Sequence, residues 1–411
     1  MCDKYLIINA GSSSLKFSLY VLPEEKELVN GYVEKIGMED SFYSLKYQGQ
    51  KIKTECFIKD HGQAVSVMLQ ELINNNFISD ISEIKGVGHR VLHGGEKYSD
   101  SVVIDETVLS DIVNLSNLGP LHHPGEIAGI IAMQKVLPKV TQVAVFDTAF
   151  HQTMPKENYM YPVPMKWYQK YGVRKYGFHG TSHKYITEEM KKKLNNNEPN
   201  LIICHIGSGA SISAIKDGCC YDTSMGLTPL DGLMMGTRSG AIDPSILEYV
   251  CKETGKDITV ITNELNKNSG YLGIAGVADC RDVEALAAAG NEDAILALNM
   301  YCDRIAKYIG QYYIELEGKI DAIVFTAGVG ENSNTIRGSV IKRLECLSIS
   351  LNKERNDKVA GYKEIQEAKI SNDASKVEVY VVPTNEEVMI LRDTYLLCND
   401  IEKDKTKKLT K

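Results

Sequence analysis

Short apolar runs separated by polar turns occupy the first hundred residues. KYLII covers positions 4–8, LKFSLYVL covers positions 15–22, and polar segments then lead to GVGHRVLHGGE at positions 86–96. Runs of this length that are rich in β-branched and aromatic residues and bounded by turn residues are typical of strands. We therefore predict a meander of antiparallel strands in this part of the chain.

The spacing of apolar residues changes to that of a helix from position 124 onward. The apolar residues predicted to share one face of this helix are Ile127, Ile130, Ile131 and Leu137. The apolar run QVAVFD follows at 142–147 and ends at Asp147, and such a continuous run is typical of a buried strand. A helix that leads into a buried strand indicates an α/β fold.

The second half of the chain repeats this order. It runs from LIICHIGSGASISAI at 201–215, through a helical tract at 293–316, to the strand DAIVFTAG at 321–328. The chain has 411 residues, which is longer than a single hydrophobic core usually supports, so two domains are expected. The pattern therefore predicts a duplicated α/β unit.

The C-terminal part begins with one more apolar strand, VEVYVVP at 377–383. Asn385 follows as a candidate N-cap, and two glutamates come next, where acidic residues favour the first helical turn. We predict that this helix covers 386–397 and that 402–411 is a solvated tail. The glycine-rich stretch 264–276 is predicted to be a loop.

Composition narrows the class of protein. Hydrophobic residues make up 43% of the chain and charged residues 24%, with a net charge of -8. This balance argues against a nucleic-acid binder that works by bulk attraction to phosphate. No apolar run is long enough to span a bilayer, and MCDKYLII lacks a signal-peptide layout, so we expect a cytoplasmic protein without a membrane partner. The ten cysteines form no CxxC pair, and we expect reduced core residues.

Two glycine-serine turns occupy matching places in the two halves. The first, at 11–14, contains Gly11, Ser12, Ser13 and Ser14 and is followed by Lys16; the second, at 207–209, contains Gly207, Ser208 and Gly209, with His205 before it and Ser211 after it. Such turns offer backbone N–H groups and hydroxyls to an anion, although a structural hairpin uses the same residues. The pair predicts that two turns hold a polyphosphate. The Walker, GxGxxG, GxSxG and HExxH motifs are absent.

Longer motifs extend over nearly the whole chain, and together they resemble the acetate kinase family, of the superfamily shared with sugar kinases and actin. The segments that carry the resemblance are NAGSSSLKF (9–17), GHRVLHGGE (88–96), VFDTAFHQTMP (145–155), YGFHGTSH (176–183), TSMGLTPLDGLMMGTRSGAIDP (223–244), FTAGVGEN (325–332) and PTNEE (383–387). The resemblance implies a two-domain duplicated ribonuclease H-like fold with the active site in a cleft between domains. Its expected lobes are 1–150 completed by 385–411, and a nucleotide-binding lobe at 151–384. It also implies reversible transfer of the ATP γ-phosphoryl group to a small carboxylate, with Mg²⁺ or Mn²⁺, by a homodimer.

The resemblance assigns catalytic and acceptor-binding roles. Arg90 and Arg238 would clamp the carboxylate and the transferring phosphoryl group, because a guanidinium fork matches two oxygens; a structural ion pair is the alternative for each. His179 would donate to the phosphoryl oxygens, with His122 and His205 as weaker candidates. Asp147 would hold metal-bound water or orient a group, since the acid is already ionised at neutral pH and needs no general base; the family label of acid/base implicates the same residue. The acid's methyl group would meet Leu92, Leu121, Phe178 and Pro229.

The resemblance also assigns metal and nucleotide positions. Asn9 and Glu386 match the family's magnesium positions, and a hard cation prefers oxygen ligands. The residues expected to bind the nucleotide are Lys16, Ser12, Ser14, His205, Ile206, Gly207, Ser208, Gly209, Asp279, Cys280, Arg281, Gly328, Val329, Gly330, Glu331 and Asn332.

The sequence departs from the family pattern in a few places. LHHPGE (121–126) replaces LHNPxN, HIGSG (205–209) replaces HLGNG, Leu92 replaces a frequent valine, and Cys280 stands where a larger apolar residue is common. These changes leave the preferred acid and the phosphoryl donor open. The alternatives are a propionate or butyrate kinase, a kinase with another donor such as pyrophosphate, and a nucleotide-driven conformational module that would leave both arginines unexplained.

Overall fold

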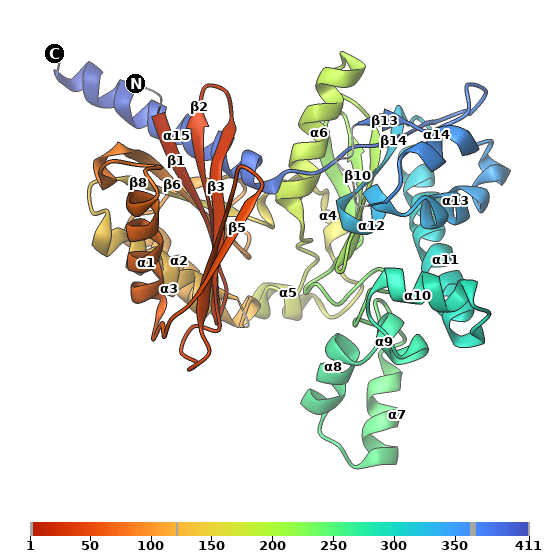
Figure 1. The fold of residues 1–411 in the computed structure, drawn as a ribbon. Helices are drawn as coiled ribbons and strands as arrows, with labels where there is room; N and C mark the ends of the chain where they lie inside the picture. Colours follow the sequence, from red (N-terminus) through yellow and green to blue (C-terminus); the bar gives the residue numbers. More distant parts are fainter. Residues whose placement is uncertain (1–2, 121, 362–366, 410–411) are drawn as a thin grey trace. The chain divides into compact units, whose positions relative to one another are not determined.

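The computed structural model describes residues 3–120, 122–361 and 367–409 (Figure 1). The chain divides into two compact units, which we call the first unit (Met1–Phe150 with Asn385–Lys411) and the second unit (His151–Thr384). Among the helices in the described ranges, none is both long and apolar enough to cross a membrane.

The first unit is built on a sheet of eight strands within the described residues, in the order β5-β4-β3-β2-β1-β6-β8-β7. Its strands are β1 (Asp3–Ala10), β2 (Ser14–Leu22), β3 (Lys26–Glu34), β4 (Phe42–Tyr47), β5 (Gln50–Glu55), β6 (Ile84–Val91), β7 (Val102–Val103) and β8 (Thr141–Phe146). The predicted antiparallel meander is confirmed for β1 to β5. The part of the prediction that included 86–96 is wrong, because β6 pairs in parallel with β1 and with β8. A parallel pair requires a crossover, which α1 and the following turns provide.

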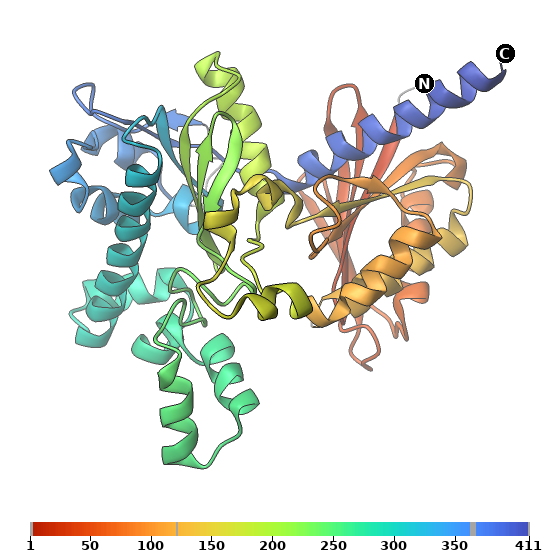
Figure 2. The same ribbon diagram turned by 180° about the vertical axis from the view of Figure 1, so that it is seen from behind.

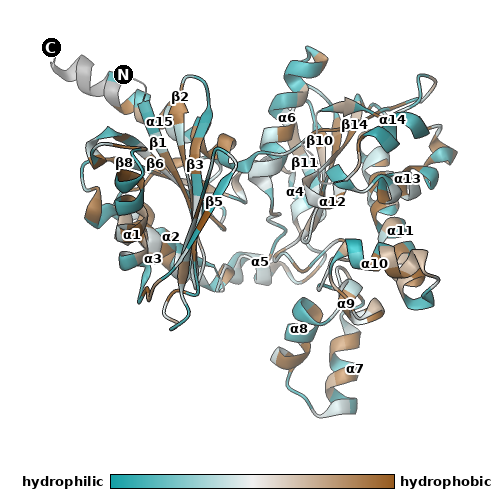
Figure 3. Cartoon of the chain, viewed as in Figure 1, coloured by the Kyte–Doolittle hydropathy of each residue, from teal (hydrophilic) through white to brown (hydrophobic). Residues whose placement is uncertain are grey.

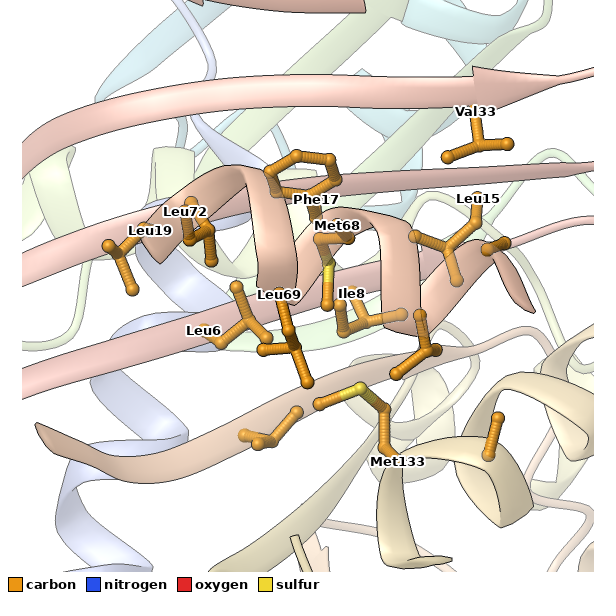
Figure 4. Packing of buried hydrophobic residues seen from close by; sticks show 14 of the residues in the cluster. Leu6, Ile8, Leu15, Phe17, Leu19, Val33, Met68, Leu69, Leu72 and Met133 are labelled. Atoms are coloured by element: carbon orange, nitrogen blue, oxygen red, sulfur yellow. The ribbon is translucent and has the colours of Figure 1, made fainter. Parts of the chain in front are cut away.

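Helices cover both faces of this sheet. They are α1 (His61–Asn74), α2 (Glu106–Asn114), α3 (His123–Val136) and α15 (Glu386–Leu409). Side chains alternate along a strand, so Leu6 and Ile8 join the core formed with α1 and α3 (Figure 4). Tyr5, on the other face, makes an edge-to-face contact with Tyr395 of α15. The view from behind shows α15 along that face (Figure 2).

The second unit repeats the central strand order. Its strands are β9 (Leu201–Ile206), β10 (Ala210–Lys216), β11 (Cys219–Thr223), β12 (Ala322–Thr326), β13 (Ala368–Lys369) and β14 (Glu378–Val381), arranged as β11-β10-β9-β12-β14-β13. The run β11-β10-β9-β12-β14 matches β3-β2-β1-β6-β8 in order and in strand direction. The predicted duplicated α/β fold is therefore confirmed.

The second unit contains eleven α-helices within the described residues. They are α4 (Lys156–Tyr159), α5 (Met165–Tyr171), α6 (Gly180–Leu194), α7 (Ser245–Thr254), α8 (Ile258–Lys267), α9 (Gly270–Ala275), α10 (Cys280–Ala288), α11 (Glu292–Glu315), α12 (Ala327–Asn332), α13 (Asn334–Lys342) and α14 (Lys353–Lys358). α6 packs against β9, and α11 packs against β10 and β9 (Figure 1). α12 begins directly after β12, so the end of that strand leads into a helix N-terminus.

Three expectations about helices need correction. The stretch 264–276 is not a loop, because α8 ends within it and α9 lies inside it. The last helix continues to Leu409 instead of ending near 397. On α3, Ile130 is buried as predicted but Ile131 is 49% exposed, so the apolar residues do not share one face. The predicted cap is confirmed, since the Asn385 side chain accepts from the backbone N–H of Val388 at 3.0 Å.

Candidate functional site

A buried ion pair lies at the carboxyl ends of two parallel strands in the first unit. Arg90 comes from β6, and Asp147 directly follows β8, where its N–H donates to the carbonyl of Val91 at 2.9 Å. The Nη2 atom of Arg90 lies 3.0 Å from Oδ2 of Asp147, and the two side chains are 16% and 1% exposed. The carboxyl ends of strands are where α/β sheets expose ligand-binding groups. Arg90 therefore makes the structural ion pair that was the alternative to a binding role. The pair occupies one end of its guanidinium fork, through Nη2.

Two further carboxyl groups surround the same guanidinium. Glu126 of α3 is buried and accepts the N–H of Leu92 with both oxygens, at 3.1 and 3.2 Å, and its Oε1 lies 4.0 Å from Nη1 of Arg90. Glu386, the first residue of α15, interacts electrostatically with Arg90 and Asp147. Burial raises the pKa of Glu126 to about 7, although Arg90 acts in the opposite direction. Burial and then the charge of Asp147 raise the pKa of Glu386. One guanidinium therefore faces three carboxyl groups and cannot neutralise them all.

This excess of carboxylate oxygens, which can act as metal ligands, fits a hard divalent cation. Glu386 is one of the two expected metal positions and belongs to the cluster. The other, Asn9, is exposed near the end of β1 and pairs in register with Lys16 of β2. No group of three or more His, Cys, Asp or Glu side chains in the described ranges is arranged as a metal site. A cation that keeps several waters, as Mg²⁺ does, needs only one or two carboxylates.

The first glycine-serine turn connects β1 and β2. The N–H of Gly11 donates to the carbonyl of Ser14 at 2.8 Å, while Ser12 and Lys16 are exposed and Ser14 is half-buried. Gly125 of α3 packs directly beneath, because a Cβ atom added there would overlap the carbonyl group of Gly11. The turn is therefore held from below by a helix backbone, and its expected anion-binding groups remain on the surface.

The second turn connects β9 and β10 and is one residue shorter between paired strand positions. The N–H of Gly207 donates to the carbonyl of Gly209 at 3.0 Å. A Cβ atom on Gly209 would lie 3.5 Å from Nε2 of His179 and 3.6 Å from Nη1 of Arg238. Two residues expected to act in phosphoryl transfer therefore meet at this turn. The ring of His179 also stacks on that of His205 at 4.1 Å.

Arg238 has no carboxylate partner among the described residues. Its Nη1 atom donates to the carbonyl of Pro229 at 3.2 Å and contacts the sulfur of Met235 at 3.6 Å. Burial lowers the pKa of Arg238, and no acidic side chain offsets this effect. A half-buried cation without an anion is costly unless a ligand supplies one. The arrangement therefore favours an anion at the second turn.

A cavity of about 190 Å³ adjoins this turn in the second unit. It is lined by Gly207, Ser208, Gly236, Tyr271, Ala278, Asp279, Cys280, Arg281, Gly328 and Val329. The residues expected to bind the nucleotide from three separate segments thus line one space. The glycines let a flat ligand approach the backbone, and the exposed Arg281 is held by Asp279, with Nε 2.9 Å from Oδ1.

Other expected nucleotide residues face the protein itself. The carboxylate of Glu331 accepts the N–H of Ala327 at 2.7 Å and that of Thr384 at 3.0 Å. The amide of Asn332 donates to the carbonyl of Gly328 at 2.8 Å. The side chain of Ile206 and the α-carbon of Gly330 are buried. The side-chain contacts of Glu331 and Asn332 hold the segment that follows β12.

The residues expected to meet the methyl group of the acid belong to both units. Leu92, in the first unit, is 5% exposed and follows Arg90 closely along the chain; Phe178, in the second, is 1% exposed. Pro229 supplies the carbonyl that Arg238 contacts. Leu121 lies outside the described residues.

Sequence reasoning missed two groups. Glu126 belongs to LHHPGE, a departure from the family pattern, and an acidic side chain in an apolar helical stretch is a signal of a buried polar role. His183 was not singled out, although it lies in the quoted YGFHGTSH segment. Its imidazole and that of His179 both reach the hydroxyl of Ser211, each at 2.9 Å.

Comparison with known proteins places the whole chain in context. The model of the Acetokinase family matches residues 4–392. The acetate kinase of Bacillus cytotoxicus is 50% identical over 400 residues, which cover 97% of this chain and 99% of the relative. That of Acholeplasma laidlawii is 49% identical over 398 residues, covering 96% and 100%.

Solved structures give the same result. The Porphyromonas gingivalis acetate kinase superimposes with a TM-score of 0.92 at 43% identity, covering 96% of this chain and 99% of that one. A propionate kinase from Francisella tularensis gives a TM-score of 0.90 at 42% identity, covering 96% and 100%.

Proposed function

The chain belongs to the acetokinase family, and we propose that the Arg90 cluster and the second glycine-serine turn carry its two substrates. The reaction is the reversible transfer of the γ-phosphoryl group of ATP to acetate, giving acetyl phosphate and ADP. The observation that best supports the assignment is Arg238, a half-buried guanidinium that has no carboxylate partner in the described ranges and lies beside the second turn. An anion at that position would complete its environment.

Arg238 and His179 would bind the phosphoryl group being transferred. Charge in such a transfer spreads over the equatorial oxygens, so catalysis depends on positioning and on positive or hydrogen-bonding groups aimed at them. A guanidinium fork and an imidazole N–H at one glycine turn provide both. Gly209 has no side chain that would separate them from the phosphate.

The cavity beside the turn would hold the adenosine. Its glycines at 207, 236 and 328 leave room for a flat base, and Asp279 and Arg281 also line it. The first turn, with Ser12, Ser14 and Lys16, would contribute further donors to the phosphates.

Arg90 would bind the carboxylate of acetate, with Leu92 beside its methyl group. The guanidinium already donates to Asp147 through Nη2, so Asp147 orients the fork toward the acceptor. No general base is required because acetate is ionised at neutral pH.

Glu386 and Asn9 would hold Mg²⁺ together with water, and Asp147 would accept from that water. When bound, Mg²⁺ would neutralise charge on the phosphate oxygens. The support is the cluster of carboxyl groups around Arg90, in which burial, and to a smaller extent the charge of Asp147, raises the pKa values of Glu126 and Glu386.

We also propose that the enzyme acts in the cytoplasm. The cysteines that the structure describes form no disulfide, as suits a reducing compartment.

A panel of acids and phosphoryl donors tests the proposed substrates. We expect hydroxamate trapping to show acyl phosphate formed fastest from acetate and ATP. Propionate should be poorer by about 1–3 kcal/mol in kcat/KM, the cost of one methylene. Equal rates with ATP, GTP and pyrophosphate would contradict the nucleotide assignment, and a preference for propionate would make the chain similar in activity to its Francisella tularensis neighbour.

We propose a homodimer that forms through the pair of helices α7 and α8. In Figure 3 both helices, which project from the rest of the second unit, include brown segments that mark apolar residues. Tyr249 is 65% exposed, Ile258 is 48% exposed and Ile246 is 43% exposed. α7, which is described along its full length, buries none of its residues. An exposed apolar patch on a two-helix projection is typical of an interaction surface.

Charged substitutions on this patch test the homodimer. We expect Ile246→Glu with Tyr249→Glu to convert the protein to a monomer in light scattering, because burying two carboxylates at an interface is costly. The matched control is Ile314→Glu, because Ile314 is equally apolar and 77% exposed but belongs to a different helix, α11. A double variant that remains dimeric would rule out this surface.

A further inference from the structure

The hydroxyl of Ser211 lies between two imidazole rings. Ser211 is the second residue of β10 and is fully buried. Its Oγ is 2.9 Å from Nδ1 of His179 and 2.9 Å from Nε2 of His183. A hydroxyl has one hydrogen to donate and can accept more than one, so the two contacts cannot both be donations from Ser211.

The environment of His183 determines which group donates in the hydrogen bond between His183 and Ser211. Its ring is fully buried, and burial lowers its pKa well below the usual value, so the imidazole is neutral. Its Nδ1 atom has no hydrogen-bond partner in the described part of the chain. A proton on Nδ1 would leave a buried donor unsatisfied, which is unfavourable. The proton therefore lies on Nε2 and is donated to Ser211.

The direction of the hydrogen bond between Ser211 and His179 then follows. The oxygen of Ser211 already accepts from His183, and its own hydrogen has one acceptor among the described residues, Nδ1 of His179. If His179 accepts at Nδ1, the proton of its neutral ring lies on Nε2. That nitrogen is the one beside the second turn, 3.5 Å from the position of a Cβ atom on Gly209.

We propose that Ser211 and His183 are positioning residues that fix His179 in the tautomer with its proton on Nε2, so that it donates toward the phosphoryl group at the second turn. The proposal deepens the function proposed above and rests on it for the role of His179. The backbone of His179 supports it, because its φ of 58° is in the left-handed region, where a non-glycine residue needs holding by its surroundings.

The stack with His205 acts in the same direction. The two rings are 4.1 Å apart and nearly parallel at 20°, and Nδ1 of His205 is 2.8 Å from Oγ of Ser182. Positive charge on both rings at this separation would be repulsive. A neutral His179 that donates one N–H is therefore favoured over a doubly charged pair.

Nitrogen-15 NMR of the full-length enzyme labelled at histidine tests the tautomer directly. At pH 8 we expect the His179 signals, identified by their absence in His179→Gln, to show a protonated Nε2 and an unprotonated Nδ1. A protonated Nδ1 in the wild-type enzyme would overturn the proposal, and this measurement needs neither activity nor a Ser211 variant.

Kinetics of Ser211→Ala give the second readout. We expect kcat to fall about 10- to 100-fold, as for other residues that orient a functional side chain, while KM for acetate and ATP changes less than about threefold. Ser211→Thr, which keeps the hydroxyl, should retain more activity. The control is Ser213→Ala, which removes an equally buried hydroxyl that bonds Thr223 at 2.9 Å on the same strand and should leave kcat unchanged.

The two proposals fail in different ways. Unchanged kcat in His179→Gln would remove His179 from catalysis, and the NMR result would still stand or fall alone. Wild-type kcat and an unchanged tautomer in Ser211→Ala would overturn the positioning role, even if His179 proves essential.

Discussion

Arg238→Ala is expected to lower kcat about 10³-fold, the lower end of the range for an arginine that serves phosphoryl transfer. Among the described residues, Arg238 donates to the carbonyl of Pro229 and to the sulfur of Met235. No carboxylate in the described ranges balances its charge, so its removal breaks no internal ion pair. The loss should therefore appear in the reaction and much less in the free energy of unfolding.

Two variants sharpen this test. Arg238→Lys keeps the charge but loses the fork, so we expect an intermediate kcat. Arg343→Ala is the matched control, because Arg343 is also half-buried, belongs to the second unit, and donates to the carbonyl of Ser339 and the amide oxygen of Asn299. Steady-state kinetics should show wild-type kcat for Arg343→Ala. Wild-type kcat for Arg238→Ala would remove that residue from the active site.

The sequence was sufficient wherever structure depends on neighbouring residues. The strands at 4–8 and 15–22 and the turn between them follow from apolar alternation and glycine, and Asn385 caps the last helix because its side chain reaches the N–H of Val388. The repeated order of elements in the two halves, and the α/β class, can also be predicted from the sequence.

The pairing of strands that are distant in the sequence could not be predicted. The parallel partner of β6 is β1, far earlier in the chain, and nothing in GVGHRV distinguishes a parallel strand from an antiparallel one. The stretch 264–276 looked like a loop because Gly270 and Gly273 disfavour helix, but Gly270 has a φ of 61° at the start of α9 and lies against the backbone of Met235. Tertiary contact outweighs helix propensity there.

The candidate site shows the same division. Several residues named from the motifs lie near Arg90 or near the second turn. What the motifs could not show is how those residues are held: Gly125 beneath Gly11, Glu126 on the N–H of Leu92, and the link from His183 through Ser211 to His179. Each depends on a contact between side chains or backbones that only the folded chain brings together.

Arg90→Ala is expected to destabilise the first unit and abolish acetate binding. Removing one partner of a buried ion pair costs about 3–5 kcal/mol, because the remaining charge is left uncompensated. Here Asp147, Glu126 and Glu386 would all remain. The matched control is Arg392→Ala: Arg392 makes two bonds to Glu25, at 2.7 and 2.8 Å, in the same unit, but these side chains are more exposed, so the cost should be about 0–1 kcal/mol.

The destabilisation by Arg90→Ala should also depend on pH. The pKa of Glu126 is raised from its ordinary value to about 7 in the folded protein. A carboxyl group with a raised folded pKa stabilises the fold below its unfolded pKa, and that contribution is lost as pH rises through the folded value. Arg90 holds the pKa of Glu126 down, so its removal moves the loss to higher pH and makes it larger. We therefore expect a greater difference in unfolding free energy from wild type at pH 8.5 than at pH 5.5.

Glu126→Gln in the Arg90→Ala background separates charge from packing. Glutamine keeps one acceptor for the N–H of Leu92 but cannot ionise, so the double variant should regain stability at pH 8.5 and very little at pH 5.5. Acetate kinase activity should stay lost with or without Glu126→Gln, because Glu126 cannot replace the guanidinium fork that we propose binds the acceptor. Urea unfolding in EDTA at the two pH values measures the first effect, and hydroxamate trapping measures the second. A double variant that is no more stable than Arg90→Ala at pH 8.5 would show that the charge of Glu126 does not cause the instability of Arg90→Ala.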